Sequence, residues 1–167
     1  MMTAEFLHFL QTLQSTVQHL DPMSPLQSSL DSLLSMTAEA MKYRRMALAI
    51  FDPKANTIRF DLTYGHKGPV KATYLPGQGV TGQVLDSGKP IIIEAMELDE
   101  RFLNKAMGRS TKELGELSFI CVPIFRINAD GVQEALGVLS ADIPCQPMAT
   151  LRMHCAFLEV LASVIAR

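Results

Sequence analysis

The stretch TYLPGQGVTGQVLDSGKP, residues 73–90, decides how this sequence is interpreted. Within it, Gly77, Gly79 and Gly82 form G-x-G-x-x-G, the spacing that brings a backbone close to a pyrophosphate in dinucleotide-binding folds. The motif alone is weak evidence, because such a site also needs a preceding parallel strand and a crossover helix. The neighbouring residues therefore decide whether these glycines hold a nucleotide.

The residues on either side of the glycines argue against a nucleotide. Leu75-Pro76 precedes them, and proline fits poorly inside a central strand. The helix that follows is limited to residues 80–87, because Gly88 and Pro90 end it. A crossover between parallel strands takes at least about 10 residues. The sequence therefore lacks the context of a phosphate loop.

The same glycines have a structural explanation that needs no ligand. Gly77 and Gly79 are predicted to take positive φ in a tight bend, which glycine adopts at no steric cost. Gly82 is predicted to let the short helix lie close against the sheet, since it carries no Cβ. We interpret the motif as a signature of the fold.

The rest of the chain changes between helical and strand periods, which predicts an α+β fold. Asp130-Gly131, between the last two strands, favours a hairpin. The sheet is predicted to be mainly antiparallel, with five to six strands and flanking helices. Helices are predicted over 2–20, 26–42 and 149–166, a helical turn over 99–108, and strands over 44–52, 57–65, 90–95, 117–127 and 134–143.

Composition limits the class of protein. A hydrophobic content of 48% and a charged content of 19% are those of a globular domain, and 167 residues are enough for one core. A net charge of −2 gives no electrostatic footprint for nucleic acid. The apolar runs are shorter than a bilayer requires, so no membrane association is predicted. Three cysteines, an odd number at irregular spacing, indicate free thiols in the reducing cytoplasm.

Three segments together resemble a GAF domain, over about residues 26–167. They are PGQGVTGQVLDSGKPIIIEAMELDERFLNKAMG (76–108), LSFICVPIF (117–125) and EALGVLSADI (134–143). The order of DERFLNK before FICVPI is most similar to the N-terminal sensory GAF of Nif-specific regulatory proteins, which activate nitrogen-fixation genes. The resemblance implies a GAF-like, profilin-like sheet and a non-catalytic sensory role. Residues 1–25 are interpreted as a separate N-terminal helix and link.

The sequence also bears on what such a domain does. It contains no G-x-x-x-x-G-K-[ST] loop and no helix-turn-helix after the sheet, so we expect the controlled output domain to lie outside this chain. Free methionine sulfoxide reductases share the architecture and need a redox cysteine pair over the pocket, where this sequence has none. Cys121, Cys145 and Cys155 are interpreted as structural thiols. Four scattered histidines give no metal-ligand spacing. We predict no catalysis, with a reductase-like redox enzyme as the alternative.

The resemblance implies 2-oxoglutarate as one candidate ligand, and a dicarboxylate would need cationic or backbone donors. The alternatives left open are a solvated charged loop, and a ligand-free domain that binds a nitrogen-status regulator protein. The pocket is predicted to have a cover of charged and apolar residues and a floor on the two central strands. The cover comprises Arg101, Phe102, Leu103, Lys105 and Arg109, and the floor Phe119, Cys121, Leu139 and Ala141.

The N-terminal helix carries an apolar stripe at alternating steps of four and three residues. Exposed alone, such a stripe would be an adhesive apolar surface, so we predict a homodimer in which it packs with the last helix. The alternative is that the helix folds back on its own sheet. The predicted dimer residues are Phe6, Leu10, Leu13, Val17, Leu20, Leu158 and Leu161.

Overall fold

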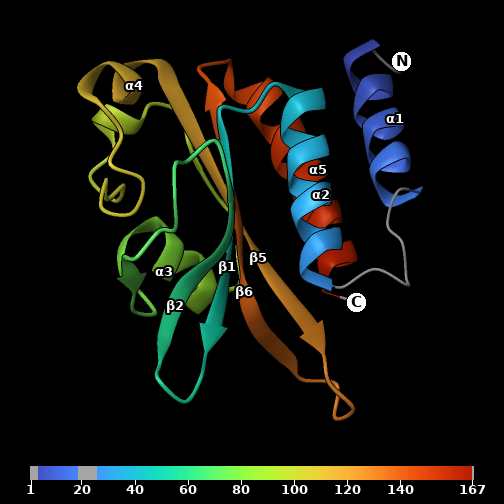
Figure 1. Cartoon of the computed structure of the whole chain (residues 1–167), viewed down its shortest axis with the longest axis vertical. Coiled ribbons are helices and arrows are strands. Elements are labelled where there is room, and N and C mark those ends of the chain that lie inside the picture. The colour runs from blue at the N-terminus through green and yellow to red at the C-terminus, as the bar shows by residue number, and fades with distance from the viewer. Residues whose placement is uncertain (1–3, 19–25, 167) are drawn as a thin grey trace.

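The computed structural model describes residues 4–18 and 26–166 of the chain. A single sheet has the strand order β3-β2-β1-β6-β5-β4, with every neighbouring pair antiparallel. The predicted α+β class and mainly antiparallel sheet are confirmed (Figure 1). The helices are α1 (Ala4–Gln18), α2 (Leu26–Met41), α3 (Gly79–Ser87), the 3-10 helix η1 (Met96–Leu98), α4 (Thr111–Glu116) and α5 (Met148–Ile165). The strands are β1 (Arg45–Asp52), β2 (Thr57–Tyr64), β3 (Thr73–Tyr74), β4 (Ile91–Ile93), β5 (Leu117–Ile127) and β6 (Gln133–Pro144).

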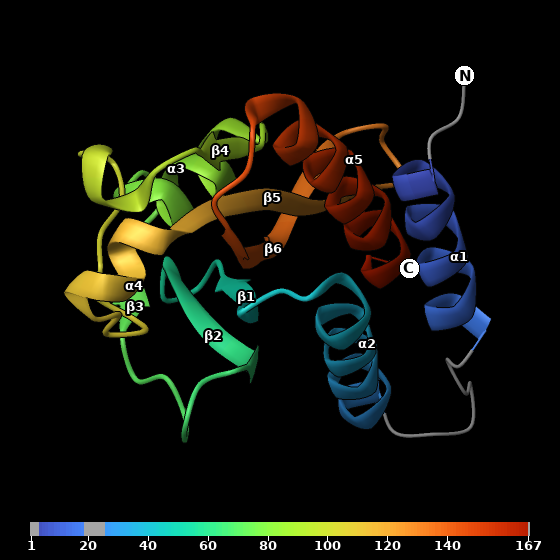
Figure 2. The same ribbon diagram turned by 90° about the horizontal axis from the view of Figure 1, so that it is seen from above.

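Helices cover both faces of the sheet, as Figure 2 shows: α1, α2 and α5 lie on one side, α3 and α4 on the other. Each side has its own apolar cluster. Ile120 and Val122 of β5 point toward α5, whereas Phe119 and Cys121 point toward α3. This alternation is the period-2 pattern of a strand buried on both faces, and it places the region around α3 opposite the helical layer.

The glycine-rich stretch forms the predicted bend and short helix, but Gly82 lies against the preceding turn and not, as predicted, against the sheet. Gly77 and Gly79 have φ of 85° and 60°. A Cβ on Gly82 would lie 2.3 Å from the carbonyl oxygen of Leu75, so only glycine fits where α3 meets the preceding turn. The strands that flank α3 are β3 and β4, which lie at opposite edges of an antiparallel sheet. A parallel βαβ unit, which a dinucleotide fingerprint requires, is therefore not formed around these glycines.

Three local features differ from the sequence prediction. Residues 99–108, predicted as a helical turn, form a loop, and the helices nearby are η1 before it and α4 after it. The hydroxyl of Ser110 accepts a hydrogen bond from the backbone N–H of Glu113, and the Glu113 carboxylate accepts one from the N–H of Ser110. This reciprocal cap explains why α4, which was not predicted, starts at Thr111. The short β3 was also not predicted.

The last helix corrects part of the dimer prediction. Leu158 and Leu161 are fully buried between α5 and the sheet, so they belong to the core and are not available to a second chain. In the described part of the chain, α5 is also the one helix whose length and composition would suit a membrane. Its inner face, which includes Leu151, is packed on the sheet, as in a core helix.

The N-terminal helix packs on its own domain, yet part of its stripe stays exposed. Phe9 is buried against His154 and Phe157 of α5, with ring centroids 4.8 and 5.6 Å away. Leu10 is 45% exposed, and Leu13 is half-buried. The side chains of Phe6, Val17 and Leu20 lie outside the described residues. Phe9, which is not part of the predicted stripe, thus packs on α5 and not on the sheet as the fold-back alternative had it, while Leu10 of the stripe is exposed.

Candidate ligand pocket

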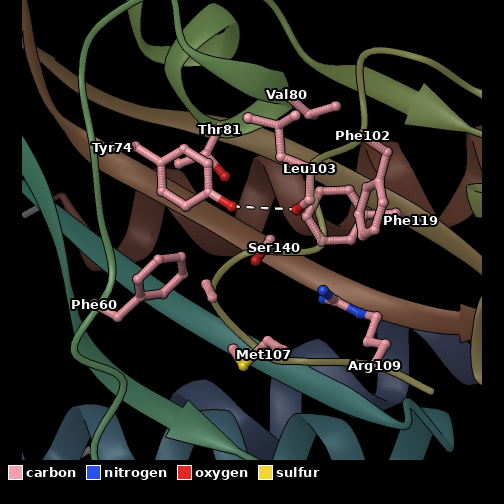
Figure 3. Close-up of a pocket in the computed structure, with 11 residues that line it drawn as sticks. Phe60, Tyr74, Val80, Thr81, Phe102, Leu103, Met107, Arg109, Phe119 and Ser140 are labelled. Atoms are coloured by element: carbon pink, nitrogen blue, oxygen red, sulfur yellow. Dashed lines mark hydrogen bonds between the residues drawn. The ribbon is translucent and has the colours of Figure 1, made fainter.

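A small cavity lies between the sheet, α3 and the loop over residues 99–110, which we name the cover segment. Its volume is about 20 Å³, close to the space that one water molecule needs. The cover segment contributes several of its walls (Figure 3). The lining residues are Phe60, Tyr74, Val80, Thr81, Phe102, Leu103, Ala106, Met107, Arg109, Phe119 and Ser140.

Four aromatic rings line the cavity, in two pairs. Phe102 and Phe119 stack edge to face at 5.1 Å, and Phe60 and Tyr74 at 6.0 Å. The Tyr74 hydroxyl donates a hydrogen bond of 3.3 Å to the carbonyl oxygen of Leu103. Burial raises the pKa of Tyr74, so the hydroxyl keeps its proton and remains a donor. The cover segment is thereby connected to the β3 side of the cavity.

A buried arginine is the principal polar group of the cavity. Nε and Nη2 of Arg109 donate to the two carboxylate oxygens of Asp142 at 2.6 and 2.7 Å. Its guanidinium also lies 4.9 Å from the Phe102 ring centroid and 5.5 Å from that of Phe119. Asn104 fixes the backbone of Arg109 by two hydrogen bonds, of 2.8 and 2.7 Å. Because Arg109 is 7% exposed, its charge acts in a partly desolvated site.

A second arginine shares the same carboxylate. Arg45 of β1 approaches Asp142 from the other side, with 3.2 Å between Nη1 and Oδ2. Its Nη2 lies 2.5 Å from Glu113 of α4. The hydrogen bond from Arg45, followed by that from the Ser110 backbone, lowers the pKa of Glu113. Buried Arg109, partly buried Arg45 and two carboxylates thus form one network that joins the cover segment, β1, β6 and α4.

The structure brings together part of the predicted site. Phe102, Leu103, Arg109 and Phe119 line the cavity. Lys105 is near Tyr74, with Nζ 4.6 Å from the ring centroid, and donates to Gln78 at 3.2 Å. Arg101 is not among the residues that line the cavity.

Arg101 forms a local ion pair outside the cavity. Its Nη2 lies 2.8 Å from Asp99, and the side chain is 47% exposed. The hydrogen bond from Arg101 lowers the pKa of Asp99. For this arginine, the solvated-loop alternative describes the structure.

The sequence prediction placed residues from both faces of the sheet in the pocket floor. The pairing of β5 with β6 shows which face each residue occupies. Phe119 pairs with Asp142 and Cys121 with Ser140, so these four residues share the face toward α3. Leu139 and Ala141, placed in the floor by the sequence prediction, lie on the face toward α5 and belong to the other cluster. Cys121 is on the pocket side but buried beneath the lining.

Ser140 and Asp142 were missed, although the alternation in LSADI gives a signal. Once Leu139 and Ala141 are assigned to one face, the polar residues between and after them must face the other. A polar side chain inside a buried strand needs a partner, and Asp142 finds it in the two arginines.

The thiols and metal-ligating groups give no reactive centre in the described residues. Cys121 and Cys155 are buried, and burial raises the pKa of both thiols, to about 12 for Cys155. Cys145 is exposed. Within residues 4–18 and 26–166, no three histidine, cysteine or acidic side chains gather as a metal site would require. The residues that line the cavity offer hydrogen bonds, a charge and aromatic surface to a ligand.

A sequence profile of the GAF domain matches residues 25–167, and the chain belongs to the GAF family. Nitrogen fixation protein VnfA of Azotobacter vinelandii is 28% identical over 145 residues, covering 85% of this chain and 27% of that protein. The Nif-specific regulatory protein of Azotobacter vinelandii is 26% identical over 163 residues, covering 95% of this chain and 30% of that protein. The chain thus spans less than a third of the length of these relatives.

Solved structures show the same fold. The GAF domain of A. aeolicus NLH2 in an inactive state has a TM-score of 0.80 at 20% identity, covering 97% of this chain and 95% of that one. The free methionine-R-sulfoxide reductase of Neisseria meningitidis, in complex with its substrate, has a TM-score of 0.71 at 18% identity, covering 98% and 89%. Proteins with different functions therefore share this architecture, and the fold alone does not select one of them.

Proposed function

We propose that this chain is the sensory domain of a bacterial transcriptional activator of the nitrogen-fixation type. In this proposal it acts in the cytoplasm, binds a small metabolite beneath the cover segment, and controls an output domain without catalysis. The regulatory part is supported by the similarity to VnfA and the Nif-specific regulatory protein. The binding part is supported by one observation above all: Arg109 is a buried cation at an aromatic cavity.

The candidate metabolite is 2-oxoglutarate, whose carboxylates suit an arginine donor. A cavity of about 20 Å³ is too small for it, so in this proposal the described conformation is a closed one. Binding requires the cover segment to move. The small cavity equally supports the second candidate function, a ligand-free domain that contacts a nitrogen-status regulator protein.

Calorimetry with 2-oxoglutarate separates these two functions. We expect binding by the unmodified protein and its loss in Arg109→Gln, because the buried donor is removed. Arg101→Gln is the matched control, since Arg101 is exposed and pairs only with Asp99 among the described residues. Thermal shift provides a parallel readout, because a ligand at 100 times its Kd stabilises by about 2.7 kcal/mol. Equal binding by both variants would place the site elsewhere, and no binding by any of them would support the ligand-free function.

We propose further that the domain forms a homodimer through the exposed sides of α1 and α5. An apolar groove of about 460 Å³ lies between these helices, and Leu10 and Val160 are exposed beside it. Leu10→Glu is expected to convert a dimer into a monomer, because a charge would be buried without a partner. The control is Leu98→Glu, at an 80% exposed position on η1. Sedimentation that shows the unmodified protein as a monomer at high micromolar concentration would contradict the dimer.

A further inference from the structure

The carboxylate of Asp142 is bound by two arginines. Arg109 holds both of its oxygens, and Arg45 adds a third contact at 3.2 Å. Arg45, in contrast, is under-used: its Nε is buried and has no hydrogen-bond partner in the described residues. A buried donor without an acceptor is uncommon in native structures and requires an explanation. Arg45 nevertheless holds Asp142 through Nη1 and Glu113 through Nη2, so Asp142 has a second cation besides Arg109.

The Arg109–Asp142 pair is also the closest polar contact between the cover segment and the sheet. The contact of Tyr74 with Leu103 is 3.3 Å and that of Lys105 with Gln78 is 3.2 Å, against 2.6 and 2.7 Å for the ion pair. Figure 3 shows the guanidinium of Arg109 reaching from the cover segment into the cavity. The cover is therefore held by the same group that a ligand in the cavity would meet.

We propose that the Arg109–Asp142 pair is exchangeable. A carboxylate of a small ligand takes the place of Asp142 on Arg109, and Asp142 stays bound by Nη1 of Arg45. This inference deepens the proposed sensory function, on which its ligand rests, by naming the ligand class and the closing device of the cavity. The class is a carboxylate with a small body, because Nε and Nη2 of an arginine match the two oxygens of a planar carboxylate.

The charges explain why such an exchange is energetically feasible. A buried ion that loses its only partner costs several kcal/mol, which would prevent simple opening of the cover. With Arg45 in place, Asp142 keeps a cation after Arg109 leaves. Arg109 exchanges one carboxylate for another of the same geometry. Each buried charge therefore has an opposite charge in both states, and a modest difference in affinity decides between them.

The first experiment measures the closure without any ligand. Hydrogen exchange at the backbone amides of residues 102–109 is compared between the unmodified protein and Asp142→Asn. We expect at least tenfold faster exchange in the variant, because the neutral amide holds Arg109 weakly. Glu134→Gln is the control, since it neutralises a carboxylate in an exposed ion pair with Arg126. Unchanged exchange in Asp142→Asn would overturn the proposal.

The second experiment measures the exchange itself, by calorimetry with acetate, pyruvate, 2-oxoglutarate and the dimethyl ester of 2-oxoglutarate. Removing the internal competitor should tighten binding of at least one free carboxylate tenfold or more in Asp142→Asn, with no binding of the ester. If Asp142 only positions Arg109, the same variant should bind more weakly. Equal, weaker or absent binding by Asp142→Asn would thus overturn the exchange.

The outcomes distinguish the two proposals. Binding by the unmodified protein but weaker binding by Asp142→Asn would leave the sensory function in place and refute the exchange. Binding by the variant alone would support the exchange and contradict sensing by the unmodified chain. Should Asp142→Asn fail to fold, Arg109→Lys retains a cation with one point of contact. It is expected to speed exchange at residues 102–109 at least threefold, and an unchanged rate would refute the proposal.

Discussion

Gly82→Ala tests the explanation of the glycine-rich stretch, because it adds a single methyl group. The new Cβ would lie 2.3 Å from the Leu75 carbonyl oxygen and 2.9 Å from the Gly77 nitrogen, both backbone atoms. Overpacking of this kind costs about 1–3 kcal/mol. Weakening the hydrogen bond from the Gly77 N–H to the Gly82 carbonyl, now 2.8 Å, adds about 1 kcal/mol. Because alanine favours a helix more than glycine does, the substitution also stabilises α3 by about 1 kcal/mol.

The net expectation for Gly82→Ala is a loss of about 1–3 kcal/mol in the free energy of unfolding, from the sum of these three terms. Urea denaturation followed by circular dichroism measures it. Gly115→Ala is the matched control in α4, where the new Cβ meets only the flexible carboxylate of Glu97 at 3.2 Å. That variant is expected to be as stable as the unmodified protein or more so. If Gly82→Ala behaves like the control, the close approach of α3 to its preceding turn is not what requires glycine.

Two further predictions concern the burial of a histidine and of the cysteines. Burial lowers the pKa of His154 to about 4 in the folded protein. As the pH falls below about 6.5, the unfolded chain therefore binds a proton at this histidine before the folded protein does. The free energy of unfolding should thus decrease between about pH 6.5 and pH 4. Urea midpoints at pH 7 and pH 5 should differ less in His154→Gln, and an equal difference would contradict the assignment. Cys145 should react with a thiol reagent in the native protein, whereas Cys121 and Cys155 should react only in denaturant. Rapid native labelling of all three would show that the core opens readily.

Most of the fold could be predicted from the sequence because its elements are locally specified. The boundaries of β5 match the apolar run LSFICVPIFRI, and the turn after it contains Asp130-Gly131. Gly88 ends α3 with φ of 70°, as a helix-terminating glycine should. The misses are short elements: β3 has only two residues, and α4 has six. Such pieces depend on tertiary contacts more than on a periodic pattern.

The site was less predictable, because it depends on which face of a strand each residue occupies. In a strand buried on both sides, such as β6, apolar residues face both ways: Val138 lies toward α3 and Leu139 toward α5. Hydrophobicity alone therefore does not indicate the pocket face, and the signal that was missed is the pair of polar residues Ser140 and Asp142. The loop residues were assigned by their place in the segment, and their side chains diverge: Arg109 turns inward to Asp142, while Arg101 is bound to Asp99. That difference depends on a carboxylate more than thirty residues away, which no local pattern contains.

The ion network around Asp142 joins the neighbouring strands β1 and β6, close to a contact with α5. Arg45 and Asp142 face each other in the register of β1 and β6, and the N–H of Arg44 donates to the Asp142 carbonyl at 2.9 Å. Tyr43, immediately before, is hydrogen-bonded at 2.7 Å to His154 of α5. A change of partner at Asp142 therefore occurs within two residues of a buried contact with the helical layer.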